Sequence, residues 1–481
     1  MKILFISSEV SPFAKVGGLG DVAGSLPKAL SRNGNDCRVI LPLYSMIAEN
    51  SNWNLELVGE FELAIRQDWK EQYRLFQLQS ENVTFYFVEH DQFFKAATSS
   101  ESIYTPGVDQ YLFFSEAVLD LPKQLGWQPN VVHCNDWQTG FIPVLMREKY
   151  TSRFQDVATL YTIHNLAYQG EFGSEILDDL GLPRSLYVPE RLETYGGVNF
   201  LKSGCVYSDQ VNTVSPTYAV EIQTPEYGCR LEGLMKWLAE NGRLTGILNG
   251  IDLEVFNPET DSHLPEHFSA ANLAGKAKVR TALLQRVELP KLPNAALVGS
   301  VTRLSSQKGL DLLAAAVPLL TKLNFQLIVQ GLGDPSIASK FRELQLAFPS
   351  HVRLIEKFDE EIAHNIYGGT DLFAMPSSFE PCGLGQMISL RYGSLPLVRG
   401  TGGLADTVFD GQNGFVFQER SVDQLVDAFT RARACFDRPD EWEKMVQRGM
   451  DSDFSWARSA SQYEDVYRTA LAVRPELLFT G

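Results

Sequence analysis

The chain has 481 residues, more than one hydrophobic core usually supports, so at least two domains are expected. Hydrophobic residues make up 44% and charged residues 21%, a globular composition that excludes a disordered chain and a coiled coil. Acidic residues exceed basic ones and give a net charge of −17. This balance disfavours binding to nucleic acid phosphates and is compatible with a neutral polymer as substrate.

The cysteines and the apolar runs indicate the cellular compartment in which the protein is expected. The six cysteines are scattered without a Cys-x-x-Cys pair, which argues against a zinc cage and a disulfide framework and favours a reducing compartment. The N-terminal apolar run lacks the length and cleavage site of a signal peptide, and no stretch approaches 18 uninterrupted apolar residues. We therefore expect a cytoplasmic protein that binds neither membranes nor nucleic acid.

The first part of the chain alternates between expected strands and helices. Residues 3–6 form an apolar run, residues 15–20 a glycine-rich loop, residues 21–32 a helix and residues 37–43 a second strand. This order predicts βαβ units and a parallel sheet. Residues 55–94 show the alternation of antiparallel strands, which indicates an insertion. Further strands are expected at 131–134 and 158–164, with a helix at 141–149.

A second α/β block begins after a Pro-containing polar stretch at residues 249–261, which we interpret as a linker. Its expected strands are 295–301, 325–329, 352–355, 372–375 and 395–398, with a helix at 309–320. The pattern predicts an α/β protein with two doubly wound domains, residues 1–250 and 262–454, facing across a deep cleft. Ligands of such sheets bind at the carboxyl ends of the strands, so the chemistry is expected there.

A glycine-rich loop follows the first strand, with the sequence Lys15-Val16-Gly17-Gly18-Leu19-Gly20-Asp21. Glycine lets a backbone approach a ligand closely, and the N-terminus of the following helix offers free N–H groups to an anion. The spacing does not match the Gly-x-Gly-x-x-Gly fingerprint of dinucleotide-binding loops. A ligand-binding loop and a tight structural turn both remain open on this pattern alone.

Two cations follow the first strand of the second block. Arg303 and Lys308 lie five residues apart, where an arginine can bind a diphosphate through two hydrogen bonds and a lysine can act as a point charge. Solvated surface charge is the alternative. After a later strand comes Ser377, followed by Glu380, a carboxylate that can reach a sugar ahead of a helix expected to open near Gly383.

Other strands of both blocks end in polar or glycine residues. In the second block these are Thr401, Gly402 and Gly403; in the first they are Asp136 with Trp137 and His164 with Asn165. A lone histidine at such a place is more often structural. Because Asp136 and Trp137 end a neighbouring strand, we expect His164 to take part in the site.

Five segments together resemble the bacterial glycogen synthases and plant starch synthases. They begin at Lys15, His164, Asn249, Arg303 and Glu380, and run in that family's order along most of the chain. The resemblance implies the GT-B fold, two Rossmann-like domains with the active site between them, and a helix at about residues 455–475 that returns to the first domain. It also implies a retaining transferase of glucose from ADP-glucose, or less often UDP-glucose, to the non-reducing end of an α-1,4-glucan.

The resemblance assigns roles by position. It implies catalytic roles for Glu380, His164, Arg303 and Lys308, with Arg303 and Lys308 on the donor diphosphate. It implies substrate contacts from Lys15, Gly17, Gly18, Asp21, Asp136, Trp137, Asn165, Asn249, Phe358, Ser377, Cys382, Gly383, Leu384, Thr401 and Gly402. Phe358 stands where relatives often have a tyrosine that stacks on the adenine. Many enzymes of this fold have a second glutamate eight residues after the first, but here that residue is Ile388.

We expect no cofactor and no metal, because Arg303 and Lys308 can neutralise the leaving diphosphate. Asp451 and Asp453 have the Asp-x-Asp spelling of metal-dependent transferases, but they precede a C-terminal helical segment and are interpreted as helix-capping, solvated residues. Segment 93–110 is shorter than in some relatives, so Tyr104 is not assigned a role.

Three rival functions stay open beside a glycogen or starch synthase. They are a GT-B glucosyltransferase with another acceptor, an NAD-dependent oxidoreductase and a non-catalytic glucan-binding protein. The imperfect glycine fingerprint speaks against the second, and the retained polar residues speak against the third. The sequence leaves open the choice between ADP-glucose and UDP-glucose, association with glucan granules, and whether Glu380 acts as a base, a charge stabiliser or a sugar ligand.

Overall fold

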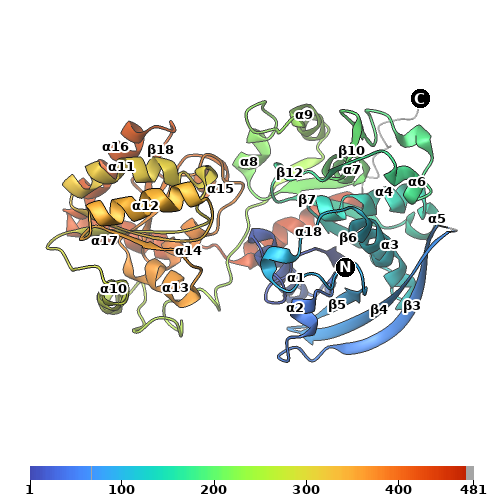
Figure 1. The fold of residues 1–481 in the computed structure, drawn as a ribbon, viewed down its shortest axis with the longest axis horizontal. Coiled ribbons are helices and arrows are strands. Elements are labelled where there is room, and N and C mark those ends of the chain that lie inside the picture. The colour runs from blue at the N-terminus through green and yellow to red at the C-terminus, as the bar shows by residue number, and fades with distance from the viewer. Residues whose placement is uncertain (67, 473–481) are drawn as a thin grey trace. The chain divides into compact units, whose positions relative to one another are not determined.

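A computed structural model divides the chain into two compact units and describes residues 1–66 and 68–472 (Figure 1). Unit 1 contains Met1–Val214, Ala219–Ile247 and the described residues from Trp456 to 472. Unit 2 contains Ser215–Tyr218 and Leu248–Ser455. The stretch 249–261, predicted as a linker, therefore belongs to unit 2.

The central sheet of unit 1 is a doubly wound parallel sheet with an antiparallel extension. Its strands are β1 (Lys2–Ile6), β2 (Asp36–Pro42), β3 (Glu56–Arg66), β4 (Trp69–Ser80), β5 (Val83–Glu89), β6 (Val131–Asn135), β7 (Ala158–Ile163), β11 (Gln210–Thr213) and β12 (Leu244–Gly246). Across the described residues their order is β12-β11-β7-β6-β1-β2-β5-β4-β3. Only the pairs β3–β4 and β4–β5 are antiparallel, so the predicted insertion is present, but β5 also pairs in parallel with β2.

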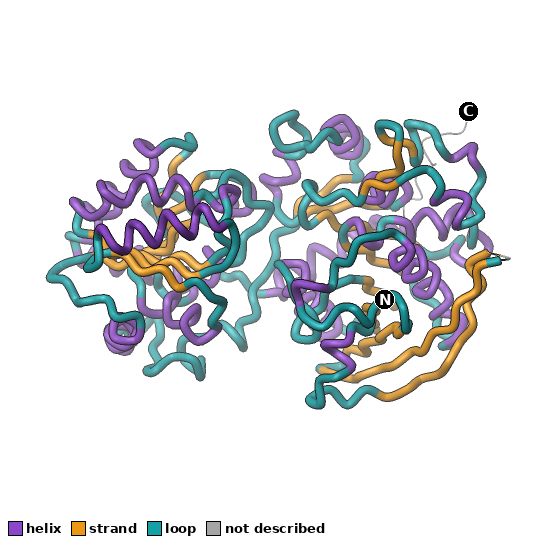
Figure 2. Tube along the Cα trace, viewed as in Figure 1, coloured by secondary structure: helices purple, strands orange, loops and turns teal. Residues whose placement is uncertain are grey.

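Helices cover the unit 1 sheet. They are α1 (Gly18–Arg32), α2 (Ser45–Ala48), α3 (Asp109–Gln124), α4 (Phe141–Glu148), α5 (Thr151–Phe154), α6 (Ile176–Asp179), α7 (Phe200–Tyr207), α8 (Pro216–Glu221, which begins in unit 2), α9 (Glu232–Glu240) and α18 (Trp456–Ala472). A small sheet is formed by β8 (Glu171–Phe172), β10 (Gly197–Asn199) and β9 (Glu193–Thr194). Figure 2 shows these helices around the strands.

The last described helix, α18, packs against α1 and β7 of unit 1. The Tyr467 hydroxyl lies 2.8 Å from Nδ1 of His133, and Asn212 donates a 3.1 Å hydrogen bond to the Tyr463 hydroxyl. These buried polar contacts fix the helix on strands β6 and β11. The expected continuation of this helix to residue 475 lies outside the described residues.

Unit 2 is built on a parallel sheet. Its strands are β13 (Ala296–Val301), β14 (Phe325–Gln330), β15 (Val352–Ile355), β16 (Leu372–Met375), β17 (Leu395–Arg399) and β18 (Phe415–Phe417). Its helices are α10 (Ala274–Arg286), α11 (Leu310–Lys322), α12 (Pro335–Ala347), α13 (Glu360–Gly369), α14 (Gly385–Arg391), α15 (Gly402–Thr407), α16 (Val422–Phe436) and α17 (Pro439–Met450). The order in the described sheet, β15-β14-β13-β16-β17-β18, is that of a Rossmann fold.

The inner strands form because short apolar runs are buried on both faces. Ile3 to Ile6 of β1 and Ala296 to Val298 of β13 are completely inaccessible to solvent, as expected for parallel strands covered by helices. The six cysteines all lie in the described ranges and are free. Within those ranges, no helix has the length and apolar character that crossing a bilayer requires.

Two predicted helix starts are wrong by a few residues. α1 begins at Gly18 rather than at Asp21, so the glycine-rich stretch includes its first turn. α14 begins at Gly385 rather than near Gly383, because Gly383 has φ +73°, a left-handed conformation that no helix residue adopts.

Candidate active site

The parallel part of each large sheet has a point where the strand order reverses, and ligands of such folds bind beside it. In unit 1 the reversal lies between β1 and β6, and in unit 2 between β13 and β16. Most of the predicted residues follow the carboxyl ends of these strands and of their neighbours β7 and β17, whereas Asn249 follows β12 and Phe358 follows β15. We describe the two groups separately as the unit 1 site and the unit 2 site.

The loop after β1 is held by a buried carboxylate that the sequence pattern did not single out. Glu9 accepts hydrogen bonds from the backbone N–H groups of Val16, over 2.6 Å, and Gly17, over 2.9 Å. Its other oxygen accepts a short hydrogen bond from the Tyr104 hydroxyl. Glu9 is only 4% exposed, and burial together with Glu9 raises the pKa of Tyr104. Glu9 therefore fixes the glycine-rich loop, and Tyr104 fixes Glu9.

The tip of this loop is open. Lys15 and Asp21 form an ion pair of 2.7 Å on the surface, which joins two predicted site residues. Gly17 and Gly18 are exposed, and a Cβ atom added to either would meet nothing within 4 Å. Gly17 has φ −146°, so neither a positive φ nor packing within the chain requires glycine here. The free space is what a ligand approaching the backbone would occupy.

Asp136, after β6, is in a strained and buried position. Its φ of +54° is rare for a residue other than glycine, and strain of this kind clusters at functional sites. Oδ1 accepts a 2.7 Å hydrogen bond from the backbone N–H of His164. Burial raises the pKa of Asp136 to about 7; backbone N–H groups of His164 and Asn165 oppose this rise, and nearby Glu9 adds to it.

His164, after β7, is held as a neutral ring. Nε2 lies 2.9 Å from Oδ1 of Asn135, whose amide nitrogen donates to the carbonyl of Ile6. Because that amide oxygen can only accept, Nε2 carries the proton and Nδ1 is left as an acceptor. Burial lowers the pKa of His164 to about 3. The side chain of Asn165 accepts from Ala167 N–H and so shapes the adjoining turn.

Trp137 is half-buried in an aromatic cluster of unit 1. Its ring centroid lies 4.6 Å from that of Tyr111 and 5.8 Å from that of Phe172. A Cβ on Gly170 would come within 2.3 Å of the indole. Trp137 is thus firmly positioned by packing, whatever it binds.

The centre of the unit 2 site is a buried ion pair. Nζ of Lys308 lies 2.9 Å and 2.7 Å from the two carboxylate oxygens of Glu380, and Ser377 donates a 3.0 Å hydrogen bond to the same carboxylate. Glu380 is 5% exposed. The loops after β13 and β16 therefore bring three predicted residues into one cluster.

Close backbone contacts hold the Glu380 loop. A Cβ on Gly402, which has φ +46°, would lie 1.9 Å from the Glu380 carbonyl oxygen. Gly403 donates its N–H to that oxygen over 3.1 Å, and the preceding Thr401 is buried. Gly309, with φ +68°, likewise lies against the carbonyl of Pro376. These glycines are required by packing, in contrast to Gly17 and Gly18.

Arg303 is not part of the ion-pair cluster. Its side chain is exposed and, among the described residues, makes no hydrogen bond or ion pair. The two residues predicted to bind the diphosphate therefore have different environments. Lys308 is paired with Glu380, whereas the guanidinium of Arg303 is available to a ligand.

Cys382 and Asn249 lie together beneath the same loop. Burial raises the pKa of the Cys382 thiol to about 12, although Asn249 donates to the sulfur, so the thiol stays protonated. Asn249 is buried, and its Oδ1 has no hydrogen-bond partner among the described residues. Gly383 and Leu384, half-buried, connect this point to α14, with Leu384 as its N-cap residue.

Phe358 lies near the edge of the unit 2 sheet. It follows the edge strand β15, and its side chain is 73% exposed. An exposed phenylalanine of this kind offers a stacking face. Asp451 is the C-cap residue that follows α17, and Asp453 accepts a hydrogen bond from the Ser455 N–H before α18.

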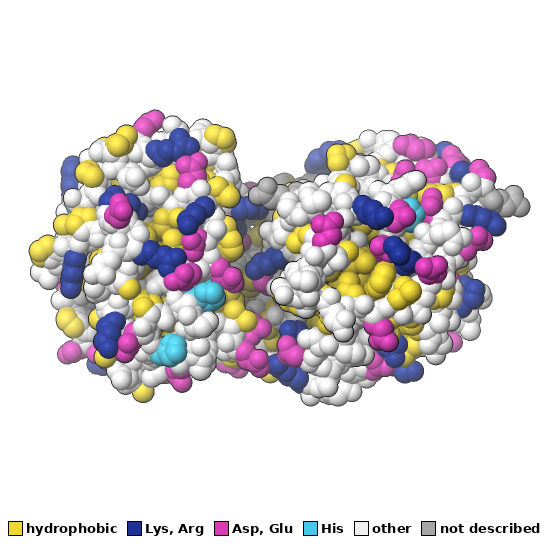
Figure 3. All heavy atoms as spheres, turned by 60° about the horizontal axis from the view of Figure 1, so that its bottom comes forward, with side chains coloured by type: hydrophobic (Ala, Val, Ile, Leu, Met, Phe, Trp, Pro, Cys, Tyr) yellow, Lys and Arg dark blue, Asp and Glu magenta, His cyan; other side chains and the backbone are white. Residues whose placement is uncertain are grey.

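The surface charge is mixed. Figure 3 shows lysine and arginine side chains interspersed with aspartate and glutamate on the displayed face of each unit. This distribution differs from the single-sign stripe of a nucleic-acid-binding surface.

Comparisons with known proteins identify the family. Residues 2–237 match the starch synthase catalytic domain, and residues 284–448 match the glycosyl transferases group 1. The glycogen synthase of Moorella thermoacetica is 43% identical over 100% of this chain and 99% of its own. That of Thermotoga maritima is 42% identical over 98% of this chain and 99% of its own. The chain belongs to the glycogen and starch synthase family.

Solved structures agree with this assignment. The catalytic domain of starch synthase IV from Arabidopsis thaliana, bound to ADP and acarbose, superposes with a TM-score of 0.90 at 35% identity and covers 98% of this chain and 99% of that one. A sucrose-phosphate synthase from Thermosynechococcus elongatus shares the fold, with a TM-score of 0.62 at 18% identity. The predicted GT-B fold and the prediction of a hexosyltransferase of this family are confirmed.

Proposed function

We propose that the protein extends an α-1,4-glucan by moving glucose from ADP-glucose to the non-reducing end, with retention of configuration. Glycogen and starch synthesis is the activity of the family to which the chain belongs. The choice of ADP-glucose is supported by the similar starch synthase IV structure, which holds ADP and acarbose. The observation that carries the chemistry is the buried Lys308–Glu380 pair at the reversal point of the unit 2 sheet.

In this proposal, the unit 2 site binds the donor. Arg303 has its guanidinium free to form two hydrogen bonds with the diphosphate, and Lys308 adds a positive charge beside it. The bond from the sugar C1 to the diphosphate breaks as positive charge develops on the sugar ring. Glu380 stabilises that charge, and its orientation is set by Lys308 and Ser377 before substrate arrives.

The new bond forms between C1 and the 4-hydroxyl of the terminal glucose, on the face that the diphosphate leaves. The hydroxyl proton passes to the departing diphosphate. Arg303 and Lys308 supply the positive charge that the leaving group needs, so the transfer itself is proposed to use neither a metal nor a cofactor.

The unit 1 site is assigned to the glucosyl unit and the acceptor chain. Neutral His164 presents Nδ1 as an acceptor for a sugar hydroxyl, and Asp136 holds the histidine backbone in place. The open Gly17 and Gly18 backbone and Lys15 are assigned to the donor. Trp137 lies on the acceptor side, while Asn249, Cys382 and Phe358 are among the residues assigned to the donor.

The test compares ADP-glucose with UDP-glucose as donors and glycogen with maltooligosaccharides as acceptors. We expect radiolabelled glucose to enter an α-1,4-glucan, with ADP-glucose giving the higher kcat/KM. Transfer to sucrose, trehalose or lipid acceptors in place of the glucan would overturn the acceptor assignment. Preference for UDP-glucose would overturn only the donor assignment.

We further propose a cytoplasmic location with access to glucan granules, supported by a set of free cysteines of which five are buried. Fractionation of cells with and without stored glucan tests this. Recovery of the protein outside the cytoplasmic and granule fractions would contradict it.

A further inference from the structure

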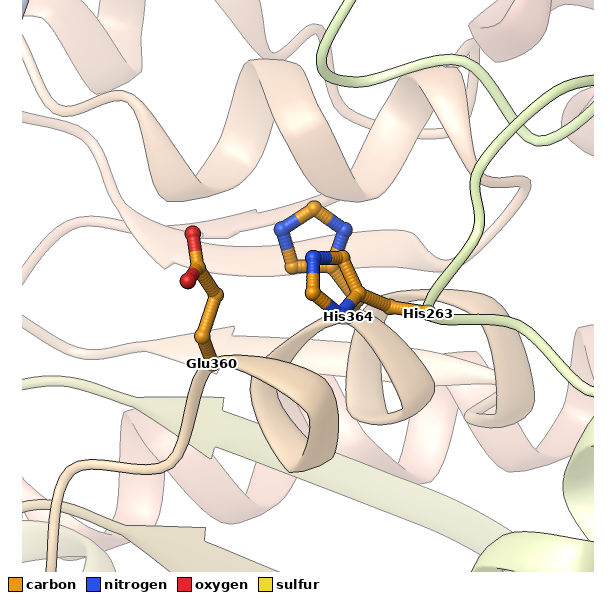
Figure 4. Close-up of side chains that lie close together, drawn as sticks. All are labelled: His263, Glu360 and His364. Carbon is orange, nitrogen blue, oxygen red and sulfur yellow. The ribbon is translucent and has the colours of Figure 1, made fainter. Parts of the chain in front are cut away.

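A second group of reactive side chains lies in unit 2, outside the proposed transferase site. It consists of His263, Glu360 and His364, and in the described part of the chain one possible ligand atom from each lies within 4.8 Å of the others. Glu360 and His364 are one helical turn apart on α13, so their side chains share a face. Figure 4 shows the carboxylate and both imidazole rings on the same side of this helix.

The ligand atoms of this group are not used by other parts of the described chain. The Glu360 carboxylate is exposed and makes no hydrogen bond or ion pair with any described residue, and neither ring nitrogen of His263 has a described hydrogen-bond partner. In His364, Nδ1 is engaged by Asp261, whereas Nε2 is not. Three convergent ligands thus have unshared electron pairs available.

Asp261 positions both histidines through contacts that leave their candidate ligand atoms free. Its Oδ2 lies 2.7 Å from Nδ1 of His364, and its Oδ1 accepts a 2.9 Å hydrogen bond from the backbone N–H of His263. Tyr392 donates to the same carboxylate over 2.5 Å. A carboxylate that binds one imidazole nitrogen and leaves the other free is the arrangement that orients metal-binding histidines in proteins.

We propose that His263, Glu360 and His364 bind a divalent transition metal ion, with Zn²⁺ as the best match. Two imidazole nitrogens and one carboxylate oxygen form a ligand set that Zn²⁺ prefers, whereas Mg²⁺ and Ca²⁺ prefer oxygen ligands. Bonds of about 2.0–2.2 Å place tetrahedral ligands roughly 3.5 Å apart. The exposed Glu360 side chain can rotate to close the remaining gap, and water completes the fourth position.

The bound ion would fasten two segments of unit 2 together. His263 belongs to the stretch that opens this unit after Leu248, and Glu360 begins α13 directly after the loop that carries Phe358. The ion would therefore stabilise unit 2 and take no part in glucosyl transfer. This inference does not depend on the proposed donor or acceptor.

The alternative is a metal-free polar cluster in which Asp261, His364 and Tyr392 satisfy one another. It needs neither His263 nor Glu360 as a ligand. Variants of these two residues consequently separate the possibilities, because neither side chain takes part in the hydrogen bonds of Asp261 to His364 and Tyr392. The Asn365 side chain on α13 also donates to the His263 carbonyl, a backbone contact that substitution of the side chain leaves in place.

The experiment uses full-length protein freed of metal by chelation and dialysis, with Zn²⁺ alone as the probe. Equilibrium dialysis with elemental analysis measures bound zinc, and Co²⁺ in its place reports tetrahedral nitrogen and oxygen ligands by its visible absorption. We expect one equivalent of Zn²⁺ per chain and a rise in Tm with zinc concentration, because the ion binds the folded state. Glu360→Gln and His263→Gln should each weaken binding by about 10-fold or more.

Glu361→Gln is the matched control, since Glu361 is the neighbouring exposed acid on α13 and pairs with Arg286 instead. It should bind zinc as the unaltered protein does. The proposal is overturned if the unaltered chain binds no zinc at micromolar concentration, or if the Glu360→Gln and His263→Gln variants retain its affinity. Either outcome leaves glucan synthesis untouched and favours the metal-free cluster.

Discussion

Lys308 donates to both oxygens of the Glu380 carboxylate, over 2.9 Å and 2.7 Å, and so joins the loops after β13 and β16. Both side chains are largely buried. In such a pair each charge offsets the cost of removing the other from water. Removal of one partner therefore leaves a buried, unpaired charge, which destabilises the folded protein. The lysine that the diphosphate is expected to meet is therefore also the residue that orients the carboxylate proposed to be catalytic.

Glu380→Gln tests the catalytic role of the carboxylate. The variant keeps the shape and an acceptor oxygen that can face Lys308, but it removes the negative charge that we propose stabilises the sugar cation. Because that cation exists only in the transition state, kcat should fall by at least about 100-fold while KM stays nearly unchanged. Steady-state kinetics and the Tm are measured on the same preparation. A variant with near-normal kcat and a lowered Tm would show that Glu380 only supports the loop.

Arg303→Ala and Lys308→Ala should differ in stability although both remove a cation. Arg303 is exposed and has no partner among the described residues, so its loss should leave the Tm unchanged. The lost charge-assisted contact of about 1.5–3 kcal/mol predicts a decrease in kcat/KM of roughly 10- to 150-fold. Lys308→Ala should lower both activity and Tm, because Glu380 is left buried and unpaired.

Equal Tm changes in these two variants would contradict the separate environments of Arg303 and Lys308. Unaltered kinetics of Arg303→Ala with the nucleotide sugar would remove Arg303 from the diphosphate site.

Strand positions and the motifs after them were predictable, because they depend on short apolar runs and on glycine and polar residues that follow in sequence. The runs at 295–301 and 372–375 are β13 and β16 to within a residue. Since both end at the reversal point of one sheet, the proximity of Lys308 and Glu380 followed from topology.

Contacts between distant segments were not predictable. Glu9 carries no local signal, and its role depends on Tyr104, far away in sequence. The group of His263, Glu360 and His364 depends on the contact between Asp261 and His364. That contact was not expected, because residues 249–261 were interpreted as a linker. The glycines illustrate the same limit: Gly18 and Gly402 look alike in sequence, yet only Gly402 has a positive φ and a carbonyl oxygen against it.

Removal of divalent metal should leave the transfer rate unchanged at temperatures well below the Tm. The reason is that, in the proposed mechanism, Arg303 and Lys308 provide the positive charge for the leaving diphosphate. Initial rates are compared before and after exhaustive chelation, and the Tm is followed in parallel. A lowered Tm with an intact rate agrees with a structural zinc ion, whereas complete loss of activity that only Mg²⁺ or Mn²⁺ restores would refute metal-independent transfer.

Gly18→Ala tests whether glycine is needed at this position so that a ligand can approach, or because the backbone conformation requires it. Gly18 is the first residue of α1 and has free space around it, so alanine should raise the free energy of unfolding by up to about 1 kcal/mol. If the donor occupies this space when it binds, the added methyl group should obstruct it, and kcat/KM should fall even though the protein is more stable. Gly233→Ala is the matched control, since Gly233 lies in the first turn of α9 with equal space. Unchanged kinetics in Gly18→Ala would assign the loop a purely structural role.

His164 and Asp136 should give opposite pH dependences of stability. Burial lowers the pKa of His164 from 6.5 to about 3, so its stabilising contribution is complete above pH 6.5 and is lost as the pH falls toward 3. Burial raises the pKa of Asp136 from 3.8 to about 7, so its contribution is complete below pH 3.8 and is lost as the pH rises through 7. Both groups titrate across the same interval with opposite signs.

His164→Gln should therefore flatten the loss of stability on acidification. The glutamine side chain can still donate a hydrogen bond to Asn135. The backbone N–H of residue 164 still donates to the Asp136 carboxylate. Denaturant unfolding at several pH values between about 4 and 6.5 measures the free energy; relative to the variant, the unaltered protein should lose up to roughly 1.4 kcal/mol more per pH unit. Asp136→Asn should change the slope in the opposite sense, because it removes a carboxyl that takes up a proton on folding. Parallel pH profiles for all three proteins would show that neither group titrates as its burial implies, and His164 would no longer qualify as a neutral acceptor beside the sugar.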